Sequence, residues 1–407
     1  MASAWFDELY QIVRAEATAP PPASRIYGVV SVALYEAVVQ GSDRNRSLVG
    51  QLNALTGVPE PLPRREYHWP AVANAAVAQA IRGIFPTLKP ASLAAIGALE
   101  NRFYEQFAAR IGQRPLARSV EHGKAVADAI LEWAEGDGFA AFNACPYVPA
   151  AVAGAWKPTP PAFAPSPAQP CWGQLRPMVI VDGTACPPLG HPEFSTDSAS
   201  EFAAAARQVR DVGLSLTEEQ KTIATFWADN PGATGTPPGH WIAIVGQLAR
   251  KHGLSLMTAA EAYARVGIAV TDAFIACWNF KYATNLQRPV TYIAERIDAT
   301  WLPYLATPPF PTYTSGHSSQ SGAASVVLTD QFGRKRFTDT IRADLKLEPP
   351  LPPRTFASFA AAAAEAAVSR LYGGIHYGFD NEHGLEAGQC VGRTIAREIR
   401  FKQRDGR

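Results

Sequence analysis

The chain has 407 residues, of which 47% are hydrophobic and 18% charged, and its formal net charge is +1. This size and apolar content predict one large or two fused globular units with a substantial core. The near-neutral charge gives no field that would attract nucleic acid or an acidic membrane, and no apolar run reaches the roughly 20 residues needed to span a bilayer, so both kinds of partner are disfavoured.

The N-terminal residues 1–7 have no basic segment before an apolar one, so the chain as given carries no export signal. We therefore expect a soluble protein, either cytoplasmic or exported with a signal already removed. Apolar helices could pack within the chain or between chains, so the sequence is also compatible with a homo-oligomer.

Residues 24–40 are apolar on nearly all sides, which predicts a buried helix. Glu36 is the exception in this run, and we expect it to pair structurally rather than react. Helical patterns continue over 71–84, 91–111 and 115–136, with Pro86 and Gly136 as stop signals. Residues 1–144 are thus predicted to form an N-terminal helical bundle without recognisable chemistry.

Residues 145–197 have a different character. Frequent prolines exclude long regular elements, because each proline removes a hydrogen-bond donor and fixes φ. Trp156 and Trp172 favour a loop that wraps around the protein over a simple linker, since exposed tryptophan is costly. We interpret this stretch as a belt that joins two helical halves.

The five cysteines are scattered and never form a C-x-x-C pair, which disfavours a structural zinc site. Cys277 lies in an apolar helical run and is predicted to be a small core residue. A disulfide among Cys145, Cys171 and Cys186 would suit an oxidising compartment, but spacing does not show which Cα atoms approach each other.

Helical pattern resumes over 198–213 and 217–229, where Thr217 and Gln220 have the spacing of a capping box. Asp229, at the predicted end of that helix, could orient a cation of a functional site or be a solvated acid. The segment 236–241 is predicted to open another helix, with His240 capping or packing there.

A helix predicted over 256–288 carries the first group of candidate site residues. Lys281 and Arg288 are seven residues apart, two helical turns, so both should point to one face that Trp278 shares. Pro289 should end the helix. By itself, the basic pair would also suit a solvated stripe.

The second group is Ser315-Gly316-His317, which follows a proline-rich approach containing Phe310. A run of small residues with helical character comes next, so the Ser315 hydroxyl and the Gly316 N–H should lie at a helix N-terminus, which favours anions. His317 is then a candidate acid–base group. The alternative is a histidine of a turn beside a helix cap.

The third group follows an alanine-rich helix predicted over 356–368. Arg370 leaves that helix, and Asp380 lies one turn beyond His376, where it can accept from one ring nitrogen and fix the tautomer. His376, Asp380 and His383 could instead form an iron site of two histidines and one carboxylate. That alternative leaves the cations without a purpose, and cations repel a divalent metal.

Taken together, the three groups supply three cations, a hydroxyl, a glycine amide and two imidazoles. Guanidinium and ammonium groups neutralise a multiply charged oxyanion, while fixed N–H and O–H donors orient it. We therefore predict a site for phosphate or a phosphate-like metal oxyanion.

The order Lys-x6-Arg-Pro, Ser-Gly-His and Ser-Arg-x5-His-x3-Asp resembles the three-part signature of the superfamily that unites type 2 phosphatidic acid phosphatases with vanadium-dependent haloperoxidases. The segments 226–229 and 236–241 extend the resemblance to soluble bacterial haloperoxidase-like proteins. It implies an all-α fold of two helical bundles, with residues 198–407 as the C-terminal bundle that carries the site. One departure is Thr314, which stands where the family usually has proline and removes a rigid constraint on the turn.

The resemblance also implies roles for single residues. His376 matches the axial residue, which is the vanadium ligand in a haloperoxidase and the phosphate-attacking nucleophile in a phosphatase, and His317 matches the acid–base histidine. Asp380 and Asp229 are expected to orient these groups. The residues that resemble the oxyanion cage are Lys281, Arg288, Ser315, Gly316 and Arg370.

Trp278 and Phe310 fall where chloride-oxidising members carry tryptophan and phenylalanine, which favours a chloroperoxidase-like enzyme over a phosphatase. The implied partners are vanadate, hydrogen peroxide, halide and a small organic substrate. In the implied mechanism His317 manages protons, Lys281 polarises the peroxide, and halide leaves as hypohalous acid. The alternatives are a soluble acid phosphatase that binds phosphate in the same site and acts through a phosphohistidine at His376, and a homologue that retains the anion cage without turnover.

Overall fold

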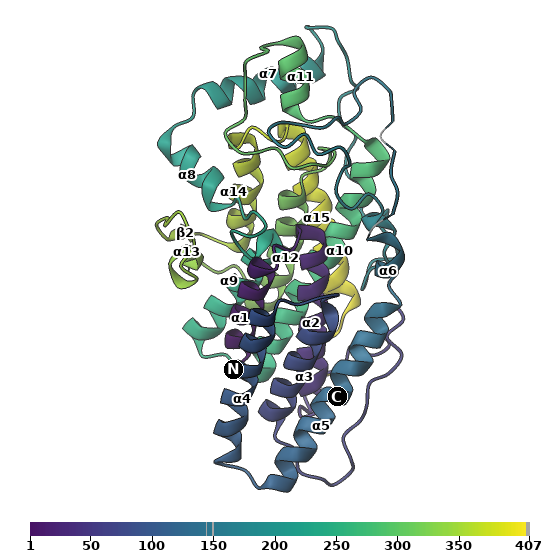
Figure 1. Cartoon of the computed structure of the whole chain (residues 1–407), viewed down its shortest axis with the longest axis vertical. Helices are drawn as coiled ribbons and strands as arrows, with labels where there is room; N and C mark the ends of the chain where they lie inside the picture. The colour runs from purple at the N-terminus through teal and green to yellow at the C-terminus, as the bar shows by residue number, and fades with distance from the viewer. Residues whose placement is uncertain (144, 149, 404–407) are drawn as a thin grey trace.

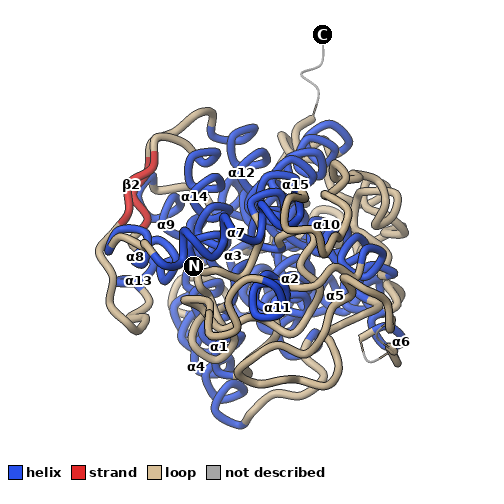
Figure 2. The backbone as a smooth tube through the Cα atoms, turned by 90° about the horizontal axis from the view of Figure 1, so that it is seen from above, coloured by secondary structure: helices blue, strands red, loops and turns tan. Residues whose placement is uncertain are grey.

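The computed structural model describes residues 1–143, 145–148 and 150–403. In this part of the chain helices predominate, and strands are confined to one antiparallel pair, Phe337–Asp339 (β1) and Arg354–Phe356 (β2). The pair lies at the edge of the helical body (Figure 2). The predicted all-α fold class is confirmed. No helix among the described residues is both long and apolar enough to cross a membrane.

The N-terminal helices lie mostly at one end of the elongated molecule (Figure 1). The second of them is buried along nearly its whole length, as its continuous apolar sequence predicted, and starts at Pro20 because proline suits the first helical turn. Glu36 accepts hydrogen bonds from the Ser47 hydroxyl at 2.7 Å and the Leu48 amide at 2.6 Å, so its role is structural. The helices are Ala2–Ala15 (α1), Pro20–Val39 (α2), Trp69–Ile84 (α3), Pro90–Ala108 (α4), Gln113–Glu135 (α5) and Phe139–Phe142 (α6).

The described residues of the proline-rich belt contain one 3-10 turn, Trp172–Gln174 (η1), and no longer element. Trp156 and Trp172 are buried, as expected for a segment that wraps around the protein. The Asp272 carboxylate holds the belt by accepting from the backbone amides of residues 178, 179 and 180 at 2.7–3.0 Å.

Two disulfides tie this belt down. Cys145 pairs with Cys171 inside the belt, and Cys186 pairs with Cys390 in the last helix, a partner that sequence reasoning did not consider. Cys277 is free and buried, in agreement with its predicted place in the core.

The remaining helices follow the belt and include the longest in the molecule. Helix α2 packs against α10, and one hydrophobic cluster contains residues from both halves of the chain. The division into 1–144, 145–197 and 198–407 stays a prediction. The helices are Glu201–Leu214 (α7), Glu218–Phe226 (α8), Thr236–His252 (α9), Leu256–Thr284 (α10), Pro289–Arg296 (α11), Gly316–Phe332 (α12), Ile341–Asp344 (α13), Phe359–Tyr372 (α14) and Gly378–Glu398 (α15).

The helix predicted over 256–288 ends earlier than expected. Helix α10 stops at Thr284, Asn285 adopts a left-handed conformation with φ 48°, and Arg288 becomes the N-cap of α11 with Pro289 at its first position. The prediction that Lys281 and Arg288 share one helix face was therefore wrong. The residue before a proline avoids the α conformation, and asparagine tolerates the left-handed turn that reverses the chain.

Helices α12 and α15 lie side by side in the middle of the fold (Figure 1). Glycines at 384, 388 and 392 form a stripe on α15 with helical spacing of four. A Cβ at Gly388 would lie 1.8 Å from the Ser319 carbonyl oxygen, and one at Gly392 would lie 2.7 Å from that of Ala323. This backbone contact places the first turns of both helices together, and the Ser315 amide donates to the Asp380 carbonyl at 3.0 Å.

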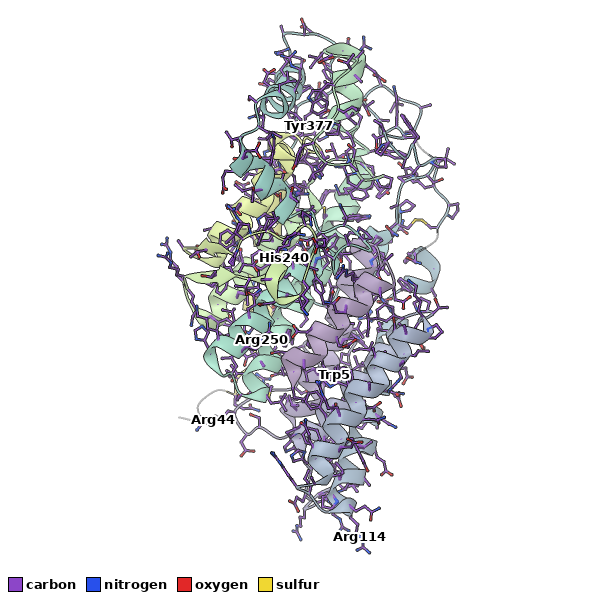
Figure 3. All side chains as sticks on the ribbon, turned by 60° about the vertical axis from the view of Figure 1, so that its left-hand side comes forward. Trp5, Arg44, Arg114, His240, Arg250 and Tyr377 are labelled. Carbon is purple, nitrogen blue, oxygen red and sulfur yellow. A yellow bond between two sulfur atoms is a disulfide. The ribbon has the colours of Figure 1, made fainter. Side chains whose placement is uncertain are left out.

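Figure 3 shows the side chains on the ribbon and labels Trp5, His240 and Arg114. Trp5 and His240 lie inside the helical body, while Arg114 reaches the surface at one end. Buried polar side chains such as His240 therefore need partners within the protein.

Replacing Gly388 by alanine should destabilise the fold strongly. The new Cβ meets backbone, which moves only by separating α12 from α15, so we expect a loss of about 2–4 kcal/mol in the free energy of unfolding. Gly97→Ala in α4 is the matched control, because nothing lies within 4 Å of its added Cβ, and it should stabilise by about 0.5–1 kcal/mol. Urea unfolding measures both; equal effects would contradict the close contact.

Candidate active site

The structure brings the predicted site residues together around one cavity of about 410 Å³, a volume typical of small-molecule sites. Lys281, Arg288, Ser315 and Asp380 do not line this cavity and lie behind its wall. The predicted site residues that line it are Asp229, Trp278, Phe310, Gly316, His317, Arg370 and His376.

His376 lies in the turn before α15 and is held by its neighbours on both ring nitrogens. Its Nδ1 is 2.9 Å from Asp380 Oδ2, which accepts, so the proton is on Nδ1 and Nε2 keeps its lone pair. Burial, and then the charge of Arg288, lower the pKa of His376 well below its usual value. A neutral imidazole whose Nε2 lone pair faces only the Arg288 guanidinium suits a metal ligand or a nucleophile.

Asp380 is itself fixed by several donors. Its Oδ2 also accepts from the Thr312 hydroxyl and from the Tyr377 amide at 3.0 Å. Thr312 Oγ1 lies 3.1 Å from His376 Nδ1 as well, so this hydroxyl helps to orient the pair. Burial raises the pKa of Asp380, and the Thr312 bond and the nearby Lys281 counteract it.

Arg288 is buried at the N-terminus of α11. Its Nε donates to the Phe310 carbonyl at 2.7 Å, and Nη1 donates to the Ile375 carbonyl at 2.8 Å and approaches His376 Nε2 at 3.1 Å. Burial lowers its pKa to about 10, so it stays charged at neutral pH. Its Nη2 has no hydrogen-bond partner among the described residues, and a buried cation with an unused donor fits an anion.

Lys281 is fully buried on α10. Its Nζ donates to the carbonyls of Pro311 and Thr312, both at 2.9 Å, and lies 5.1 Å from the centre of the Phe310 ring. Burial, and next the charge of Arg288, lower its pKa to about 7. Lys281 and Arg288 thus meet at Phe310, although they come from different helices.

Ser315 is the N-cap of α12, and its hydroxyl accepts from the Ser318 amide at 3.4 Å. The first amides of a helix have no intrahelical acceptor, so those of Gly316 and His317 are suited to an anion. A Cβ at Gly316 would lie 3.3 Å from Trp278, which explains why glycine suits this place.

His317 donates from Nε2 to the Trp227 carbonyl at 2.8 Å, so its Nδ1 is left as an acceptor. The side chain is partly exposed to the cavity that it lines. Removal from bulk water, and then the charge of Arg370, lower its pKa well below the usual value. His317 is therefore neutral and able to take a proton.

Arg370, near the end of α14, donates from Nη2 to the Ala224 carbonyl at 2.8 Å and from Nε to the Ser369 hydroxyl at 2.9 Å. Burial lowers its pKa to about 10, and the charge of Asp229 acts in the opposite direction. Asp229 forms no ion pair with Arg370 in the described part of the chain; it is in a loop beyond α8 and bonds His240 instead.

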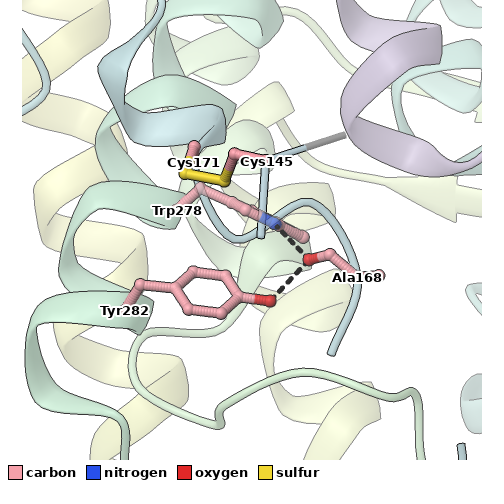
Figure 4. Close-up of a disulfide and its surroundings, with 5 residues drawn as sticks. All are labelled: Cys145, Ala168, Cys171, Trp278 and Tyr282. Carbon is pink, nitrogen blue, oxygen red and sulfur yellow. Dashed lines mark hydrogen bonds between the residues drawn. A yellow bond between two sulfur atoms is a disulfide. The ribbon is translucent and has the colours of Figure 1, made fainter. Parts of the chain in front are cut away.

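Sequence reasoning missed three contributions to the site. The Thr312 hydroxyl bonds to Asp380 and His376. The Trp227 carbonyl accepts from His317. In the belt, the Ala168 carbonyl accepts from the Trp278 indole at 3.3 Å and from the Tyr282 hydroxyl at 2.5 Å, beside a disulfide (Figure 4). Two of the three act through backbone carbonyls, which leave no mark in a sequence. The Thr312 hydroxyl, close before Ser315, was a signal that could have been used.

The iron-site alternative receives no support. His383 Nδ1 lies 3.1 Å from the Tyr313 hydroxyl, and no group of three metal-binding side chains is found among the described residues. The site instead gathers buried cations, helix-end amides and neutral imidazoles.

Comparisons with known proteins identify a family and a fold for the chain. Residues 261–403 match the family described as the VCPO second helical-bundle domain. The chain is similar to the crystal structure of the first bacterial vanadium-dependent iodoperoxidase, with 36% identity, a TM-score of 0.91, and coverage of 99% of this chain and 97% of that one. No curated protein sequence matched.

Two further crystal structures share the fold at lower identity. They are the holo and apo types of a bacterial vanadium-dependent chloroperoxidase, with TM-scores of 0.70 and 0.66 and identities of 16% and 17%. The alignments cover 94% and 92% of both chains.

Asp380→Asn should weaken orthovanadate binding by about tenfold to a hundredfold, because an amide NH2 facing Nδ1 would favour the proton on Nε2 and remove the lone pair. Asp272→Asn is the control: it is equally buried but holds the belt, so affinity should change less than about twofold. Titration followed by tryptophan fluorescence measures both affinities.

Lys281 should make anion affinity depend on pH. Its pKa is lowered to about 7, so it is charged below that pH and neutral above it, and orthovanadate should bind more weakly as the pH rises through 7. Lys281→Met should bind more weakly at pH 6 and show a flatter pH dependence between 6 and 8. An unchanged slope would mean that another group titrates.

Proposed function

The chain belongs to the vanadium-dependent haloperoxidase family, and we propose that it oxidises halide with hydrogen peroxide to hypohalous acid, using vanadate held by His376. The observation that carries the proposal is a buried lone pair beside a buried cation that has an unused donor. His376 Nε2 has a lone pair, and Arg288, whose Nη1 is 3.1 Å away, has an unused N–H.

The residues present fit this oxyanion. His376 Nε2 would be the ligand, the charges of Lys281, Arg288 and Arg370 would balance the oxygens, and the helix-end amides would donate to them. The cations donate to backbone carbonyls rather than to carboxylates, so their charges are not neutralised by ion pairs within the described residues. When bound, vanadate supplies a Lewis-acidic centre that activates hydrogen peroxide.

The chain's own residues would handle the protons. His317 carries its proton on Nε2, so Nδ1 can take a proton from hydrogen peroxide that enters the cavity and later return it to the departing oxygen. Lys281, in its charged form, would polarise the peroxide from behind the wall. The fixed donors need little rearrangement, which is what lowers a barrier in such sites.

Trp278 and Phe310 form an aromatic wall whose ring centres are 5.0 Å apart. Such a wall suits a large, weakly hydrated anion, and the relative with 36% identity is an iodoperoxidase. We expect iodide to be oxidised faster than bromide, because iodide gives up electrons more readily. Chloride belongs in the same panel because the Trp–Phe pair resembles that of chloride-oxidising relatives.

The test is peroxide-dependent oxidation of iodide, bromide and chloride, with and without added orthovanadate. Activity should require vanadate and fall at least about a hundredfold in His376→Ala, which removes the ligand. His122→Gln, a buried histidine on α5 away from the site, is the control and should keep wild-type activity.

A parallel assay follows phosphate release from a phosphomonoester without vanadate. Release that vanadate inhibits, with no halide oxidation, would overturn the proposal in favour of hydrolysis through a phosphohistidine at His376. Vanadate binding without either activity would mean that the protein keeps only the anion cage.

A further inference from the structure

Both ring nitrogens of His240 are bonded to buried carboxylates. Nδ1 is 2.8 Å from Asp229 Oδ2, and Nε2 is 2.8 Å from Asp339 Oδ2. All three side chains are at most 2% exposed, and His240 lies in the interior of the helical body (Figure 3). A carboxylate can only accept, so both nitrogens donate and the ring is an imidazolium.

The surroundings stabilise that charge. Burial alone would lower the pKa of His240, but the two carboxylates outweigh it and raise the pKa to about 9. Asp339 also accepts from the Gln247 amide at 3.0 Å and from the Ile341 N–H at 2.9 Å. The cluster therefore joins α9, β1 and the loop after α8 in one buried charged contact.

The His240 ring stacks on the indole of Trp227, with ring centres 4.3 Å apart and an angle of 20° between planes. A cation at this distance from an indole face is attracted to it. At the edge of the same indole, Trp227 Nε1 donates to the Glu365 carboxylate at 3.1 Å. Trp227 is thus held on its face by a charge and at its edge by a hydrogen bond.

Trp227 is the residue whose carbonyl accepts from His317 Nε2 at 2.8 Å. It caps the C-terminal end of α8, where carbonyls lack intrahelical donors and prefer cations or N–H groups. One turn earlier, the Ala224 carbonyl accepts from Arg370. The end of α8 therefore holds two groups of the candidate active site by backbone alone.

We propose that His240 is a positioning residue: as an imidazolium held between Asp229 and Asp339, it fixes Trp227 so that the Trp227 carbonyl keeps the His317 proton on Nε2 and leaves Nδ1 free to accept from substrate. This role rests on the proposed function, because it concerns the proton transfer assigned there to His317. His240 itself does not line the cavity and has no hydrogen bond to His317; its contact with the cavity wall is through Asp229.

A neutral His240 could donate from only one nitrogen and would leave one buried carboxylate without a partner. It would also lose the charge that attracts the Trp227 ring. Between pH 5 and 8 the phenols of Tyr10 and Tyr27 and the ring of His317 are neutral and Arg370 is charged, so these groups near the cluster keep one charge state. Arg342 also lies nearby and donates to the carbonyls of Thr225 and Phe226.

The experiment compares wild type, His240→Gln, Asp339→Asn and the control His122→Gln, all as the full chain. In His240→Gln we expect kcat for halide oxidation to fall about tenfold to a hundredfold, the usual range for impaired acid–base catalysis, while orthovanadate affinity changes less than about threefold. Asp339→Asn removes one of the two carboxylates that keep His240 charged, so the pKa of His240 should fall. As the pH is raised, this variant should therefore lose activity at a lower pH than wild type does. The control His122→Gln should match wild type in kcat, in orthovanadate affinity and in the pH dependence of activity.

Nitrogen NMR of the histidines gives a readout without vanadate or turnover. Wild type should show His317 with its proton on Nε2 and His240 charged at pH 7; His240→Gln should show a mixture of His317 tautomers. Wild-type kcat, pH profile and tautomer in a folded His240→Gln protein would overturn the proposal, as would parallel losses of vanadate affinity and thermal stability. If wild type itself oxidises no halide, the proposed function fails, and the tautomer measurement still decides the role of His240.

Discussion

The close contact between α12 and α15 is the constraint on which the site depends. At Gly388 the two backbones leave no room for a side chain, and the Ser315 amide bonds directly to the Asp380 carbonyl. Because the first turns of both helices start at this contact, the helix-end amides of one lie beside the His376–Asp380 pair of the other. Without glycine at this place, the helices would separate and the anion donors would no longer converge.

The site also depends on buried positive charge. Lys281, Arg288 and Arg370 are buried, and burying a charge without a partner is costly. Each is held by backbone carbonyls of a neighbouring loop or helix end, which orient the cation but carry no full negative charge. The site therefore retains positive charge that an oxyanion can balance, whereas carboxylate partners would have cancelled it.

Three buried or half-buried histidines show how neighbouring charges determine the protonation state of an imidazole. His376 and His317 face cations and are neutral, with pKa values well below normal, whereas His240 lies between two carboxylates and is charged. In His376 and His317 one ring nitrogen donates to a protein acceptor and the other keeps a lone pair, whereas both nitrogens of His240 donate. The same side chain is thus neutral with a lone pair in two places and a structural cation in a third.

The sequence by itself determined what depends on local order along the chain. The helical class follows from apolar periodicity, the capping box at Thr217 from spacing, and the His376–Asp380 contact from a separation of one helical turn. The three motifs also identified the residues that the fold gathers around one cavity. These patterns predict contacts reliably because helix geometry fixes which residues at i, i+3 and i+4 lie close together.

Only the tertiary structure decided which distant groups meet. Arg288 belongs to a different helix from Lys281, Cys186 pairs with Cys390, and His240 bonds Asp339 across about a hundred residues of sequence. The carbonyls of Trp227 and Ala168 hold site residues although any residue type offers a carbonyl. Such contacts depend on how the helices pack, and packing arises from the summed burial of many side chains rather than from any short motif.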